Sequence, residues 1–110
     1  MCGFAGELRF DNKPVDLAAV ARMSERIRAR GPDSDGIYQR GNLALAHRRL
    51  TIIDLSAAGE QPMLDSELGL TLVFNGCIYN YKQLRGELQE LGYKFFSDSD
   101  TEVFFKAYHR

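Results

Sequence analysis

The spacing of the strand-like runs constrains the fold of this chain more than any other feature. Apolar and polar residues alternate from Phe4 to Phe10, as in a half-buried strand. Further strand-like runs occupy residues 37–39, 43–47, 50–53, 70–74 and 93–96. A parallel pair needs a crossover of roughly a dozen or more residues, whereas the runs in the middle of the chain are joined by short turns such as Gly41-Asn42. The spacing therefore predicts antiparallel sheet.

Helical periodicity lies between and after these strands, at residues 17–27, 81–91 and 101 onward. Asp16 and Asn80 stand where N-caps are expected. Gly31-Pro32 stops the first helix, and Gly92 follows the second. Antiparallel sheet covered by helices makes an α+β layered domain. The third helix has no C-cap signal before the last residue, so we expect the domain to continue beyond residue 110.

Composition excludes several classes of protein. At 110 residues the chain has room for one domain, and 14 basic against 15 acidic side chains give a net charge of −1. No overall field therefore attracts nucleic acid or an anionic membrane. The two cysteines cannot form a disulfide framework, and they show no metal-ligand spacing with the histidines. No apolar run reaches the roughly 20 residues that span a bilayer. These features predict a cytoplasmic protein without a metal site.

The first candidate for chemistry is Cys2, which follows the initiator methionine. Removal of Met1 would leave a terminal cysteine whose own α-amine serves as the base for its thiol. Gly3 leaves space for a substrate to approach. On the dipeptide alone, the alternative that Cys2 is an unremarkable second residue stays open.

Three further positions carry functional groups suited to a small polar substrate. Asn75-Gly76 ends an apolar run, so a carboxamide and a bare backbone N–H could form an oxyanion hole, or simply a turn. Arg49, at a strand end, suits bidentate binding of a carboxylate, or is a solvated cation. Asp100 could receive an ammonium group, or cap the third helix.

Taken in order along the chain, these signals resemble the glutaminase domain of the asparagine synthetase family, a class II glutamine amidotransferase domain. The resemblance covers the whole chain. It is carried by Met1-Cys2-Gly3-Phe4-Ala5-Gly6, Arg30-Gly31-Pro32-Asp33, Ala46-His47-Arg48-Arg49-Leu50-Thr51-Ile52-Ile53-Asp54, Asn75-Gly76-Cys77-Ile78-Tyr79-Asn80 and Ser99-Asp100-Thr101-Glu102-Val103.

The resemblance implies hydrolysis of glutamine to glutamate and ammonia through a thioester on Cys2, with Asn75 and Gly76 holding the oxyanion. It also implies a glutamine pocket formed by Arg49, Leu50, Ile53, Asn75, Gly76, Cys77 and Asp100. Arg49 would bind the substrate α-carboxylate and Asp100 its α-ammonium group. Arg30 and Asp33 are expected to brace the loop of the nucleophile rather than touch substrate.

Cys77 departs from the family pattern, because asparagine synthetases usually carry an acidic residue after Asn-Gly. The Asn-Gly-Cys variant, together with residues 6–11, looks more like N-acetylglutaminylglutamine amidotransferase, which amidates a dipeptide. The ammonia acceptor therefore stays open. A non-catalytic module that binds glutamine or docks to a partner is the alternative function.

The implied fold is of the N-terminal-nucleophile type, with four layers in the order αββα and antiparallel sheets. Residues 1–110 would be the N-terminal portion of a longer glutaminase domain followed by a synthetase domain. ATP and magnesium are expected only in that synthetase domain, and no cofactor is expected in this segment. L-glutamine and the synthetase domain are the implied partners, and a homodimer is an open possibility.

Overall fold

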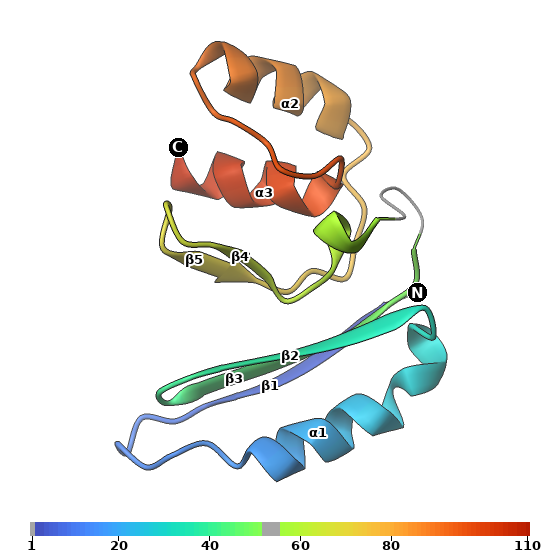
Figure 1. Ribbon diagram of the computed structural model, residues 1–110, viewed down its shortest axis with the longest axis vertical. Helices are drawn as coiled ribbons and strands as arrows, with labels where there is room; N and C mark the ends of the chain where they lie inside the picture. The colour runs from blue at the N-terminus through green and yellow to red at the C-terminus, as the bar shows by residue number, and fades with distance from the viewer. Residues whose placement is uncertain (1, 52–55) are drawn as a thin grey trace.

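The computed structural model describes residues 2–51 and 56–110. Its N-terminal half is an antiparallel sheet of three strands in the order β1-β3-β2, formed by β1 (Gly3–Leu8), β2 (Ser34–Arg40) and β3 (Leu43–Arg49). Helix α1 (Leu17–Arg26) lies along one face of this sheet (Figure 1). Val15 and Val20 pack there with Ala44 and Ala46, and all four are buried. The predicted antiparallel pairing is thus confirmed in this half.

Local sequence explains the boundaries of these elements. Asp16 caps α1 by accepting a hydrogen bond from the backbone N–H of Ala19 at 3.0 Å. The chain then passes through the short 3₁₀ turn η1 (Arg28–Arg30) to Gly31. A Cβ at Gly31 would lie 2.2 Å from the carbonyl carbon of Arg48, so only glycine allows this close approach to β3.

The second half contains a two-stranded antiparallel sheet and two helices. The strands are β4 (Met63–Asp65) and β5 (Leu70–Leu72), preceded by the 3₁₀ turn η2 (Ala57–Gly59). Helix α3 (Asp100–His109) packs on β5, and α2 (Tyr81–Glu90) packs on α3. Figure 1 shows, from bottom to top, α1, the three-stranded sheet, the two-stranded sheet, α3 and α2. The molecule is therefore a mixed α and β structure with antiparallel sheets, as expected.

Two predicted strands are shorter or absent. Residues 93–96 form no strand in the described structure, because the backbone N–H groups of Phe96 and Ser97 donate to the buried carboxylate of Glu102 instead of to a ladder. Strand β5 ends at Leu72, and the N–H of Phe74 donates to the side chain of Gln61. β4 itself was not predicted.

The expected strand at residues 50–53 is absent at residues 50 and 51, which the structure describes. Leu50 and Thr51 lie outside β3, and residues 52 and 53 lie outside the described residues. The backbone N–H of Leu50 is directed to the sulfur of Cys2, and that of Thr51 to the carboxylate of Asp33. Side chains thus replace the partner strand here.

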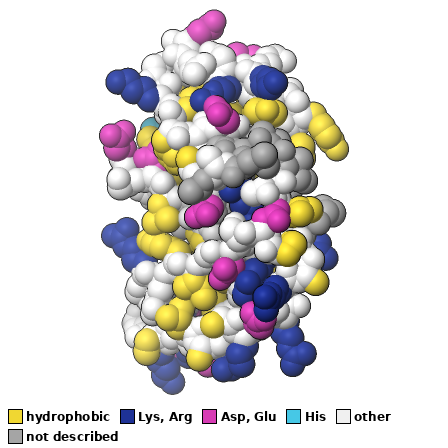
Figure 2. Space-filling view, turned by 45° about the vertical axis from the view of Figure 1, so that its right-hand side comes forward, with side chains coloured by type: hydrophobic (Ala, Val, Ile, Leu, Met, Phe, Trp, Pro, Cys, Tyr) yellow, Lys and Arg dark blue, Asp and Glu magenta, His cyan; other side chains and the backbone are white. Residues whose placement is uncertain are grey.

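Within the described residues, the three α-helices have ten residues each. In residues 2–51 and 56–110, no helix is long and apolar enough to cross a membrane. The apolar residues of α3 do not share one buried face: Phe105 is buried, Phe104 is exposed and stacks on Phe74 with 5.5 Å between ring centroids, and Tyr108 is exposed. Figure 2 shows acidic and basic side chains interspersed over the face in view, in keeping with the net charge of −1.

Candidate active site

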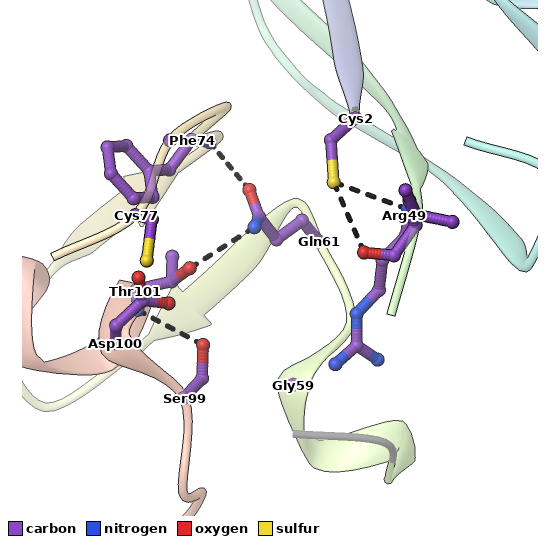
Figure 3. A pocket seen from close by; sticks show the side chains of 11 residues that line it. Cys2, Arg49, Gly59, Gln61, Phe74, Cys77, Ser99, Asp100 and Thr101 are labelled. Carbon is purple, nitrogen blue, oxygen red and sulfur yellow. Dashed lines mark hydrogen bonds between the residues drawn. The ribbon is translucent and has the colours of Figure 1, made fainter. Parts of the chain in front are cut away.

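A pocket opens between the end of the three-stranded sheet and the N-terminal end of α3 (Figure 3). Its lining includes most of the residues expected from the sequence: Cys2, Arg49, Leu50, Gly76, Cys77 and Asp100. It also includes residues that the sequence did not assign to the site: Gly59, Gln61, Phe74, Ser99 and Thr101. Ile53 lies outside the described residues.

Cys2 stands immediately before β1, and the pairing of β1 with β3 brings it beside Leu50. The backbone N–H of Leu50 donates to the Cys2 sulfur at 3.2 Å, and the thiol lies 3.6 Å from the Leu50 carbonyl oxygen. Arg30 donates through Nε to the carbonyl oxygen of Cys2 at 3.2 Å. Arg30 therefore holds the backbone of Cys2, which is the contact that bracing of this residue requires.

Arg49 is buried at the end of β3, and its guanidinium donates through Nη1 to the carbonyl oxygen of Ser56 at 2.9 Å. Its own carbonyl oxygen accepts from the backbone N–H of Asp33 at 3.0 Å. The Asp33 carboxylate accepts from both the N–H and the hydroxyl of Thr51, each at 2.7 Å, and these bonds lower the pKa of Asp33. Asp33 therefore holds the backbone on either side of Leu50.

Asn75-Gly76 follows the end of β5, and the backbone of Phe74 just before it is held at both polar groups. Its N–H donates to Oε1 of Gln61 at 2.6 Å, and its carbonyl oxygen lies 3.2 Å from Nε2 of His47. A Cβ at Gly76 would lie 2.7 Å from Cζ of the Phe74 ring. Gly76 lines the pocket, whereas the half-buried Asn75 adjoins it in the chain without lining it.

His47 is fully buried on β3. Burial lowers the pKa of its imidazole, so the ring is neutral. A carbonyl oxygen can only accept, so Nε2 carries the proton and donates to Phe74. The other ring nitrogen, Nδ1, has no hydrogen-bond partner among the described residues. His47 thus ties the three-stranded sheet to the segment that leads into Asn75.

Asp100 begins α3 but does not cap it. Ser99 is the N-cap, and its hydroxyl oxygen accepts from the N–H of Thr101 at 3.1 Å. The buried carboxylate of Asp100 accepts from the N–H of Ile78 at 2.9 Å and faces the pocket. Of the two readings left open by the sequence, the structure therefore excludes side-chain capping by Asp100.

The two cysteines carry free thiols and stand on opposite sides of the pocket. Figure 3 shows Cys2 and Arg49 on one side, Cys77, Asp100 and Thr101 on the other, and Gln61 between them. In the described part of the chain, no group of three His, Cys, Asp or Glu side chains is placed to hold a metal ion.

The pocket therefore presents a thiol, a buried cation, a buried carboxylate and backbone N–H groups within one space. A free amino acid is a zwitterion, so an arginine and an aspartate complement its two α-substituents. A thiol at the far end of the side chain could then act as a nucleophile on a carbonyl carbon. This arrangement suits acyl transfer on an amino acid.

Comparison with known proteins points the same way. A family profile described as a glutamine amidotransferase domain matches residues 1–110. The chain is 42% identical to asparagine synthetase (glutamine-hydrolysing) 1 of Bacillus subtilis (strain 168), over 98% of this chain and 17% of that protein. It is 39% identical to asparagine synthetase (glutamine-hydrolysing) 1 of Arabidopsis thaliana, over 98% and 18%, and 39% identical to asparagine synthetase B (glutamine-hydrolysing) of Escherichia coli (strain K12), over 98% and 19%.

The chain thus spans less than a fifth of the length of these curated relatives. The family profile nevertheless covers all of it, and the similarity to the relatives runs over nearly the whole chain. The chain belongs to the glutamine amidotransferase domain family, in the class II form of the asparagine synthetases, as the sequence motifs predicted.

Proposed function

We propose that this chain is the glutaminase part of an amidotransferase, which hydrolyses glutamine to glutamate and ammonia. The observation that carries the proposal is the pocket itself, in which the Cys2 thiol stands together with a buried arginine and a buried aspartate, Arg49 and Asp100. The family membership established above supports the same chemistry.

In the proposed reaction, removal of Met1 frees the α-amine of Cys2, and this amine takes the thiol proton. The sulfur attacks the side-chain amide carbon of glutamine and forms a C–S bond. The amide oxygen becomes an oxyanion held by the Asn75 side chain and the Gly76 N–H. The C–N bond then breaks, and the proton passes to the leaving nitrogen, which departs as ammonia. Water hydrolyses the γ-glutamyl thioester, which yields glutamate and restores the thiol.

The rest of the pocket would bind the substrate without reacting. Arg49 binds the α-carboxylate and Asp100 the α-ammonium group, with the backbone near Leu50 completing the wall. Ile53 and Cys77 are assigned to the same pocket from the sequence. Because a cysteine, Cys77, stands where the family pattern has an acidic residue, Asp100 carries most of the recognition of the ammonium group.

The proposal extends to the whole protein through its relatives. All three relatives above are named glutamine-hydrolysing asparagine synthetases, so we propose that the ammonia serves a fused synthetase domain that uses ATP and magnesium. The dipeptide-amidating alternative is not needed to account for this domain. No cofactor is proposed for residues 1–110, a cytoplasmic location is part of the proposal, and the homodimer stays open.

We also propose that residues 1–110 are the N-terminal portion of a four-layer αββα fold. Two features support this arrangement: α1 covers the three-stranded sheet, and α3 packs on the two-stranded sheet. On this proposal, the two sheets are the inner layers and the pocket lies between them at the end nearest Cys2.

The test is the Cys2→Ala variant, assayed for glutamate release from glutamine in the full chain. We expect a loss of activity to the background rate with an unchanged circular dichroism spectrum, because Cys2 is only half-buried and precedes β1. The comparison is Cys77→Ala, which removes the other thiol of the pocket and should retain hydrolysis even where it changes the KM for glutamine, because Cys77 is assigned to binding and not to the reaction. Hydrolysis that survives in Cys2→Ala would refute the proposal. A wild-type chain that binds glutamine without hydrolysing it would favour the binding module instead.

A further inference from the structure

We propose that Gln61 is a positioning residue that sets the oxyanion segment, Asn75-Gly76, at a fixed distance from the N-terminal end of α3. This inference rests on the proposed glutaminase function, since it concerns the two walls between which glutamine would lie. Gln61 is buried, lies in the pocket lining and stands between those walls (Figure 3).

The amide of Gln61 connects the two walls directly. Its Oε1 accepts from the backbone N–H of Phe74 at 2.6 Å, one residue before the predicted oxyanion donors Asn75 and Gly76. Its Nε2 donates to the hydroxyl oxygen of Thr101 at 3.3 Å, one residue after Asp100. One planar group of fixed length thus spans the gap between the segment for the oxyanion and the segment for the α-ammonium group.

The backbone of Gln61 is fixed as well. A Cβ at Gly36, in β2, would lie 2.3 Å from the carbonyl oxygen of Gln61, so the two backbones are in close contact. Gln61 therefore connects Phe74 and Thr101 to the three-stranded sheet, whose first strand begins directly after Cys2. His47 holds the other polar group of Phe74 from the same sheet.

The amide of Gln61 supplies what this place requires. Phe74 lies beyond the end of β5, so its N–H has no partner strand, and a buried N–H without a hydrogen bond is destabilising. A glutamine can accept from it and donate elsewhere at the same time, which a leucine or a methionine cannot. Displacement of a catalytic group by about 1 Å can cost roughly 100-fold in rate. Loss of this amide should therefore act on catalysis and not on stability alone.

The experiment uses Gln61→Leu, Thr101→Val and the double variant in the full chain. Gln61→Leu removes both hydrogen bonds. Thr101→Val removes only the hydroxyl partner and keeps the β-branched shape, so it cuts the connection while Phe74 stays bonded to Gln61. Thr101→Ser is the matched control, because it keeps the hydroxyl.

The main readout is the inhibition constant of glutamate γ-semialdehyde. Its aldehyde carbon forms a C–S bond with the Cys2 thiol while the proton passes to the aldehyde oxygen, so the adduct needs the oxyanion site. The inhibition constant of glutamate serves as the comparison, because glutamate fills the same pocket without forming that adduct. Neither constant depends on the fraction of protein that is folded.

We expect Gln61→Leu to raise the inhibition constant of the semialdehyde by roughly 10- to 100-fold, and that of glutamate by a clearly smaller factor. Thr101→Val should raise the inhibition constant of the semialdehyde by at least about threefold, whereas Thr101→Ser should not. The double variant should have the same inhibition constant as Gln61→Leu, because both changes break the same connection. If Gln61→Leu does not fold, the comparison of Thr101→Val with Thr101→Ser decides the question.

Three results would overturn the inference while leaving the glutaminase function intact. These are inhibition constants within threefold of wild type with only a lowered melting temperature, equal losses for both inhibitors, and losses that multiply in the double variant. A wild-type chain that neither hydrolyses glutamine nor binds the semialdehyde would remove the proposed function, and the inference with it.

Discussion

Replacement of Asp100 by asparagine separates binding of the substrate's α-ammonium group from the structural work of the same side chain. Asp100 is only 5% exposed, and its Oδ2 accepts from the N–H of Ile78 at 2.9 Å. The amide oxygen of asparagine can accept the same hydrogen bond, and Ser99 continues to cap α3. The variant therefore removes the negative charge and keeps the local structure.

The size of the effect follows from the burial of the carboxylate. A hydrogen bond to a charged group in such a place contributes about 1.5–3 kcal/mol, which corresponds to roughly 10- to 150-fold in binding. The charge of the α-ammonium group does not change during the reaction. Loss of the interaction between this group and the Asp100 carboxylate should therefore raise the KM for glutamine by that factor and leave kcat nearly unchanged.

The assay compares glutamine with glutaramate, the same amide without the α-amine. Asp100→Asn should impair hydrolysis of glutamine and leave hydrolysis of glutaramate within about threefold, since the second substrate has no group for Asp100 to bind. Asp98→Asn is the matched control, because Asp98 is exposed and interacts with Arg85 at 3.8 Å outside the pocket. Equal losses for the two substrates, or equal effects of the two variants, would refute the assignment of Asp100.

Two more predictions concern the backbone before and within the oxyanion segment. Gly76→Ala should lower kcat by about tenfold or more, because the added methyl group would lie 2.7 Å from the Phe74 ring and force the segment to shift. An unchanged kcat in stopped assays of glutamate release would contradict this. His47 has a folded-state pKa lowered by burial, so below about pH 6.5 the unfolded chain binds more protons than the folded chain. The free energy of unfolding should therefore rise with pH between that lowered pKa and about 6.5, by at most about 1.4 kcal/mol per pH unit. Denaturant unfolding of His47→Gln, measured over the same pH range, should lack this rise. Identical pH dependence in the two proteins would show that His47 does not titrate in this way.

The sequence predicted the elements that local patterns determine. The alternation from Phe4 to Phe10, the cap at Asp16 and the turn at Gly41-Asn42 each depend on neighbouring residues, and the structure has β1, α1 and the β2–β3 hairpin in these places. It could not predict that residues 93–96 form no strand. Their backbone partner is the carboxylate of Glu102, a contact made by the tertiary fold.

The same division applies to the pocket. Cys2, Arg49, Gly76 and Asp100 were found because the motifs that contain them resemble those of a known family when taken in order, and the structure brings them together. Gln61 was missed because an isolated glutamine in a polar loop has no periodicity and no motif of its own. Its importance depends on partners 13 and 40 residues away in the chain, so only the folded structure could reveal it.

A buried ionic cluster explains why Asp100 can have a fixed place on a short helix. The carboxylate of Glu102 is fully buried, pairs with Lys106 and accepts from the N–H and hydroxyl of Ser97 at 2.7 and 2.6 Å. Such a pair rarely adds net stability, because taking both charges out of water offsets their attraction. Its evident effect here is positional: it fastens the loop from Phe96 onward to the first turns of α3, and Ser99 caps the helix within that loop. Asp100 therefore stands between two anchored points, and the carboxylate that faces the pocket cannot drift without breaking one of them.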